Sequence, residues 1–173
     1  MKPTFPLAAV AIAATLSVAG CSNGDSKPDA APAKGHTAPK AATKLDAATA
    51  LNDIAATVTT AKKSGTVTAA NDPNHLLGRP NQYTSKVAFA DSRVAASNRS
   101  GHKPGDIELG GAIEAFANAA DAAARAKYIQ AVTKGMPALS EYDYVHGTVV
   151  IRVSRYLTPQ QAGQYKAAAS RLP

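Results

Sequence analysis

The first apolar run of the chain lies close to its start and contains no charged residue. It extends from Leu7 to Val18, follows the positively charged Lys2, and is separated from Cys21 by two small residues. The run is shorter than the about 20 residues that a membrane-spanning helix needs. A positive start, a short apolar segment and small residues at its end are typical of an export signal. We therefore predict that residues 1–20 are a bacterial signal peptide.

A polar segment follows, from Ser22 to Lys44, in which almost no apolar residue is larger than Ala. Such a segment, rich in Pro, Ala and Lys, cannot bury enough apolar surface to offset the entropy lost on ordering. We predict that residues 21–44 form a disordered tether. Random-coil statistics give it an average reach of roughly 25–30 Å.

Apolar residues recur at helical spacing in three later segments. Leu51, Ile54 and Val58 follow this spacing, and we predict an amphipathic helix over residues 45–65 that ends near Gly65. A second helix is expected to begin after Asn118, a favourable N-cap. The third is the best marked, because Thr158-Pro159-Gln160-Gln161 combines an N-cap, a proline at the first helical position and a glutamine at the third.

Alternating apolar and polar residues predict strands in residues 86–94, 106–116 and 141–154. The paired glycines Gly110 and Gly111 indicate a bulge or the close approach of another backbone. The first two strands can pair antiparallel, and the helix between the second and third favours a parallel crossover. The predicted fold is α+β, a two-layer domain over residues 66–173 with about three strands and helices on one face.

The charge of the chain is basic, with 19 Lys and Arg against 12 Asp and Glu and a formal net charge of +7. This bias favours proximity to anionic lipids or wall polymers, but the clustered cations and interleaved aromatics of a nucleic-acid site are missing from the sequence. We therefore expect no nucleic-acid partner. The single cysteine excludes an intramolecular disulfide.

That cysteine lies in the sequence Val18-Ala19-Gly20-Cys21, which resembles the bacterial lipobox. The resemblance implies that the signal is removed before Cys21 and that its sulfur carries diacylglycerol. Two long acyl chains anchor a protein stably without a transmembrane helix. The sequence thus predicts an exported lipoprotein, lipidated at Cys21, on the extracellular face of the cell membrane.

Reactive side chains are densest in a turn-rich segment and the strand that follows it. Asp72, His75, Arg79 and Tyr83 are the candidate ligand-binding residues. Arg79 suits bidentate recognition of an anion or a carbonyl group. His75 with Asp72 or Asp91 could instead act as a general base, although Asp72 before a proline is equally well explained as a turn residue.

Several stretches of the chain carry a resemblance to a family. The segment NDPNHLLGRP at residues 71–80 and the Tyr83-Thr84-Ser85-Lys86 that follows it, together with the lipobox and the region after Tyr142, resemble a group of small uncharacterised actinobacterial lipoproteins. The resemblance supports lipid anchoring and implies no activity, cofactor or site residue.

From these features we expect a membrane-anchored extracellular module that binds an envelope protein or wall polymer and is not an enzyme. No metal or cofactor is expected, because neither a zinc-ligand cluster nor a phosphate-binding glycine pattern is present in the sequence. One alternative is a small cell-envelope hydrolase that uses His75 with Asp72 or Asp91. Another is a phage- or stress-linked envelope protein that excludes another agent.

Overall fold

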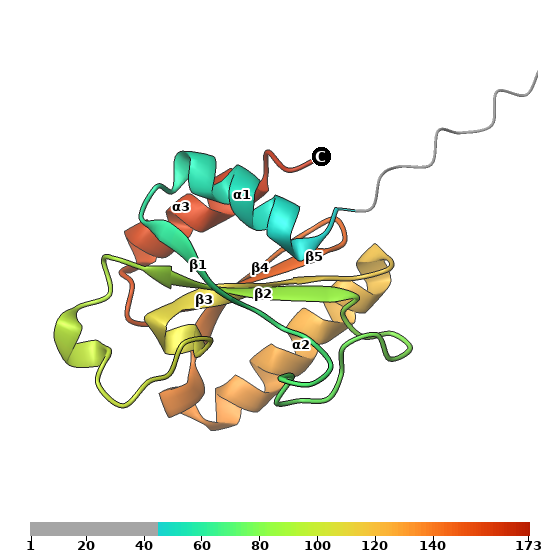
Figure 1. The fold of residues 1–173 in the computed structure, drawn as a ribbon, viewed down its shortest axis with the longest axis horizontal. Coiled ribbons are helices and arrows are strands. Elements are labelled where there is room, and N and C mark those ends of the chain that lie inside the picture. The colour runs from blue at the N-terminus through green and yellow to red at the C-terminus, as the bar shows by residue number, and fades with distance from the viewer. Residues whose placement is uncertain (1–44) are drawn as a thin grey trace, which may run out of the picture. The chain divides into compact units, whose positions relative to one another are not determined.

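The computed structural model describes residues 45–173. The predicted signal peptide, Cys21 and the predicted tether lie outside these residues. The described part is a mixed α/β fold with a five-stranded antiparallel sheet and three α-helices (Figure 1). The elements are, in order, α1 (Ala47–Thr57), β1 (Ala61–Thr66), β2 (Ser85–Asp91), β3 (Gly110–Ala115), α2 (Ala119–Gly135), β4 (Glu141–His146), β5 (Val149–Ser154) and α3 (Pro159–Ala169), with short 3-10 turns η1 (Ala96–Asn98), η2 (Ile107–Leu109) and η3 (Pro137–Leu139).

The sheet has the strand order β1-β2-β3-β5-β4, and every pair of neighbours is antiparallel. The predicted antiparallel pairing of the first two strands is confirmed by β2 and β3. The predicted single strand at 141–154 is wrong, because Gly147, with a φ of +52°, turns the chain into the hairpin β4–β5. The crossover through α2 therefore does not join two neighbouring strands: β4 runs parallel to β3, with β5 between them.

The helices cover both faces of the sheet, not one face as expected. Helices α1 and α3 lie side by side on one face, and α2 lies on the other (Figure 1). The structure therefore has three layers. The cause lies in the sheet, since both faces of its central strand β3 are buried and each needs a cover.

The first helix is shorter than predicted. It begins at Ala47 and ends at Thr57, and the carboxylate of the N-cap Asp46 accepts hydrogen bonds from the backbone amides of Ala48 and Thr49. Residues 61–66 instead form β1, which pairs with β2 and contains a bulge near Ser64. This edge strand has no apolar alternation in the sequence, so only its pairing with β2 accounts for it.

The capping residues predicted for the other two helices are confirmed. The Asn118 side chain accepts a hydrogen bond from the Asp121 backbone amide, and Thr158 and Gln161 form a reciprocal capping box. The buried residues of α3 face the sheet and include Tyr165, whose ring stacks on Phe89 of β2.

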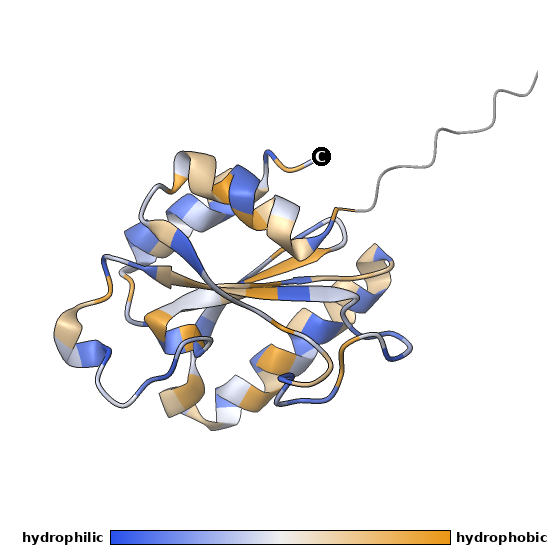
Figure 2. Cartoon of the chain, in the orientation of Figure 1, coloured by the Kyte–Doolittle hydropathy of each residue, from blue (hydrophilic) through white to orange (hydrophobic). Residues whose placement is uncertain are grey.

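The two faces of the sheet differ in chemistry. The face under α1 and α3 carries the large apolar core, including Phe89, Ile113 and Ile151. The face under α2 carries a small cluster around Tyr83 and Phe116 and, beside it, buried charged side chains. Figure 2 shows hydrophobic and hydrophilic segments alternating along the strands as well as along the helices. Within residues 45–173, no helix is both long and apolar enough to cross a membrane.

Candidate functional site

The loop between β1 and β2 is organised around Asp72. Its carboxylate, 2 % exposed, accepts hydrogen bonds from the backbone amides of Asn74, Leu76 and Leu77 at 2.8–3.1 Å and from the Tyr83 hydroxyl at 2.7 Å. Burial alone would raise the pKa of this carboxyl, but the Tyr83 hydroxyl and the amides hold it at about 2. Asp72 therefore stays ionised, and its hydrogen bonds hold the loop in place. The buried Tyr83 hydroxyl is one of the donors to this carboxylate.

His75 and Arg79 lie on the surface of the same loop. Both are exposed, and with Asp72 they line a shallow hollow of about 200 Å³. Neither side chain forms a hydrogen bond or ion pair with another described residue, and His75 has a φ of +51°. The structure thus brings three of the four predicted ligand-binding residues to one hollow, but it does not form a His75–Asp72 dyad.

Asp91 lies at the opposite end of β2 from this loop. Its carboxylate pairs with Arg93 at 2.6 Å and accepts hydrogen bonds from the hydroxyls of Tyr165 and Thr60. Burial raises the pKa of Asp91, yet Arg93 and Tyr165 together keep it below its ordinary value. Asp91 fastens the end of β2 to α3, and it is remote from His75.

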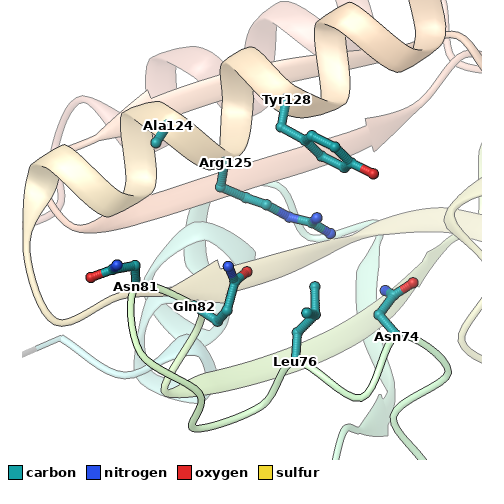
Figure 3. Close-up of a pocket in the computed structure, with 7 residues that line it drawn as sticks. All are labelled: Asn74, Leu76, Asn81, Gln82, Ala124, Arg125 and Tyr128. Carbon is teal, nitrogen blue, oxygen red and sulfur yellow. The ribbon is translucent and has the colours of Figure 1, made fainter. Parts of the chain in front are cut away.

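A hollow lies between α2 and the 72–82 loop (Figure 3). Its volume is about 470 Å³, within the range of small-molecule sites. We call it the Arg125 groove. It is lined by Asn74, Leu76, Asn81, Gln82, Ala124, Arg125 and Tyr128.

The lining of the Arg125 groove contains one charged side chain, Arg125, and three carboxamides. Tyr128 stands beside Arg125 on α2 and is 62 % exposed (Figure 3). A second hollow of about 280 Å³ shares Asn74, Arg125 and Tyr128 and continues along α2 towards Glu141. Sequence reasoning missed Arg125 and Tyr128, although their spacing of three residues on a predicted helix places them on one face.

Beneath α2, three cationic side chains form ion pairs with the fully buried carboxylate of Glu114. Lys86 Nζ lies 2.9 Å from it, Arg125 Nε 2.8 Å and Arg152 Nη1 3.2 Å. Burial would raise the pKa of Glu114, but the three cations hold it at about 2. Glu141 also pairs with Arg152, at 2.8 Å. The sheet thus holds Arg125 from below through Glu114.

Asp143 lies next to this network on the edge strand β4, opposite Arg152 in the sheet register. Its Oδ1 is buried and has no hydrogen-bond partner among the described residues. Burial and the adjacent Glu141 carboxylate raise the pKa of Asp143 to about 7. This carboxyl therefore changes charge near neutral pH. The net charge of the network under α2 changes with it.

Comparison of the chain with known proteins gives no indication of its function. No protein-family model, curated protein or solved structure matches the chain. The chemistry must therefore be argued from the described residues alone. Among them, no group of three or more His, Cys, Asp and Glu side chains is placed to hold a metal ion.

Three described carboxylates are held in structural bonds, whereas the Asp143 Oδ1 has no hydrogen-bond partner among the described residues. Asp72, Asp91 and Glu114 each carry several hydrogen bonds or ion pairs, and burial together with an ionised Asp72 raises the pKa of Tyr83. In contrast, the Arg125 groove is lined by a guanidinium, three carboxamides and a ring; the Tyr128 ring is exposed, whereas the Arg125 side chain is only 9 % exposed. This arrangement can bind and orient a molecule.

Proposed function

We propose that the chain is a lipoprotein anchored through Cys21 to the extracellular face of the cell membrane, and that its 45–173 domain is a non-catalytic binding module. The observation that carries the binding role is the Arg125 groove, whose polar lining is open while the buried acids of the domain are engaged in structural bonds. The resemblance to small actinobacterial lipoproteins and the lipobox support the anchor. Its partner would be an envelope protein or a wall polymer.

The separation of His75 from any described base favours this proposal over a hydrolase. A general base must lie within hydrogen-bond reach of its partner, and the Asp72 oxygens are already occupied by four donors. The predicted tether supports the binding role as well, because about 25–30 Å of reach lets the domain search the layer next to the membrane.

The anchor is tested by expressing the full chain with a C-terminal epitope in an actinobacterial host. We expect the N-terminal peptide of the wild type to begin at Cys21 and to carry a diacylglyceryl mass. The Cys21→Ala variant is expected to accumulate with its signal attached, and Ser22→Ala is the matched control that should be processed normally. A wild-type product that retains Met1, or that carries an unmodified Cys21 thiol, would overturn the proposal.

A further inference from the structure

The Arg125 groove has a lining that specifies the chemistry of its ligand. Its one charge is positive, and the described lining contains no acid. Resting on the proposed binding function, we infer that the groove binds an acidic saccharide, with the sugar carboxylate on Arg125, hydroxyls on the carboxamides and one ring face against Tyr128.

Arg125 is positioned for a carboxylate before any ligand arrives. Its Nε and Nη2 contact Glu114 at 2.8 and 3.3 Å, and its guanidinium lies 5.9 Å from the Tyr83 ring centre and 5.8 Å from that of Tyr128. Nη1 has no hydrogen bond to another described residue, so it keeps donors for a ligand. Planar guanidinium donors match a carboxylate better than the point charge of a lysine does.

The charges beneath the groove leave an excess of positive charge near Arg125. Glu114 is shared with Lys86 and Arg152, so the charge of Arg125 is only partly neutralised. Three cations face two ionised glutamates in this network, and the raised pKa of Asp143 leaves its carboxyl only partly ionised at neutral pH. A single carboxylate on the ligand completes the balance, whereas a phosphate dianion would need a second cation in the groove.

The remaining lining suits hydroxyl groups. Asn74, Asn81 and Gln82 each present a donor and an acceptor, as sugar hydroxyls do. The loop that carries them is held by Asp72 and by the hydrogen bond from the Gly78 amide to the Tyr83 carbonyl at 2.9 Å. Binding therefore orders little backbone, which favours affinity.

Tyr128 supplies the flat face on which the pyranose C–H groups can pack. An extended peptide is disfavoured, because β2, the strand beside this loop, is already paired with β1 and β3 and offers no free edge for main-chain pairing. The groove is formed by side chains of one helix and one loop, a geometry that accepts a ring better than a strand.

The test is a calorimetric titration of the full-length lipoprotein in detergent micelles. The probes are trigalacturonate and its methyl ester, in which each carboxylate charge is replaced by a neutral ester that also carries a methyl group. We expect the acid to bind the wild type at least about tenfold more tightly than the ester, and to bind more weakly at high salt. In Arg125→Gln the two probes should bind equally.

Two further variants guard against misfolding. Tyr128→Ala changes an exposed side chain. It should weaken the binding of both probes by about tenfold or less and leave the unfolding curve unchanged. Lys127→Gln, an exposed cation on the same helix, is the matched control and should bind like the wild type. The saccharide inference would be overturned if the wild type bound acid and ester equally. It would also be overturned if Lys127→Gln and Arg125→Gln lost the same affinity for the acid.

Two readouts separate this inference from the proposed function. A peptide with a free C-terminal carboxylate that binds in an Arg125-dependent manner, while trigalacturonate does not, would refute the saccharide class and leave the binding module standing. Release of shortened products from trigalacturonate, followed by chromatography, would instead refute the non-catalytic role.

Discussion

Single buried carboxylates organise this protein, and two of them, Asp72 and Asp91, are residues that the sequence suggested as reactive groups. Asp72 gathers three amides and Tyr83, Asp91 gathers Arg93 and Tyr165, and Glu114 gathers three cations. A buried charge is stable only when it is paired and fully hydrogen-bonded. The pattern Asp-Pro-Asn-His predicts a turn at Asp72, but it carries no information about the partner eleven residues away.

Removing one donor from Asp72 should be costly. We expect Tyr83→Phe to lower the free energy of unfolding by about 1.5–3 kcal/mol, since the hydroxyl is buried and bonded to an ionised acceptor. His75→Asn, in the same loop, should change it by less than about 0.5 kcal/mol, because His75 is exposed and Asn tolerates a positive φ. Urea unfolding followed by circular dichroism measures both, and equal effects would contradict the role of Asp72.

In β3, the two neighbouring strands determine whether a position has room for a side chain. The sequence predicted either a bulge or a close approach of backbones at Gly110-Gly111. The structure shows the close approach: β3 keeps regular register with both neighbours, and a Cβ on Gly111 would meet the Arg152 carbonyl oxygen of β5 and the ring of Phe89. A side chain has no room between these three strands.

Gly111→Ala should therefore destabilise the sheet by about 3 kcal/mol or more, because a rigid backbone oxygen cannot move away from the new methyl group. Gly65→Ala, on the edge strand β1, is the control: no other described atom lies within 4 Å of the place that its Cβ would take, and the change should be within about 0.5 kcal/mol of zero. Thermal unfolding compares the two. A tolerated Gly111→Ala would show that the three strands are less tightly packed than these distances require.

Across the domain, the two faces of the sheet are stabilised by different kinds of interaction. The face under α1 and α3 is held by a broad apolar core, whereas α2 buries only Ala122, Ala126 and Ile129 and covers the charged network. Hydrophobic burial depends little on pH, but ion pairs and buried carboxyls do. The pH dependence of stability should therefore come largely from the buried carboxyls, above all those beneath and beside α2.

The sign of that dependence differs between the carboxyls. Asp72 and Glu114, with pKa values near 2, contribute stability above their ordinary pKa values, and this contribution is lost as the pH falls towards about 2. Asp143, with its pKa raised to about 7, keeps its proton more tightly in the folded state, so stability falls as the pH rises from about 4 to 7.

We therefore expect the free energy of unfolding to be highest near about pH 4–5 and to decline on both sides. Asp143→Asn should remove the decline towards neutral pH and leave the acid side unchanged, because the amide cannot ionise. Asp53→Asn, an exposed position on α1, is the matched control and should keep the wild-type profile. Urea unfolding at a series of pH values measures this, and an unchanged profile in Asp143→Asn would refute the assignment.

The local patterns of the chain were sufficient for everything that depends on neighbours in sequence. The caps at Asn118 and Thr158 and the strands β2 and β3 follow from propensity, periodicity and short-range hydrogen bonds. The lipobox prediction at Cys21 also rests on a local pattern, and it stays a prediction. Other features depend on contacts between distant segments: the strand β1, the second helical layer and the contacts of Arg125 with Glu114 and the 72–82 loop. No local pattern encodes them, because hydrogen bonds between strands and the pairing of buried charges are settled only when the sheet has brought those segments together.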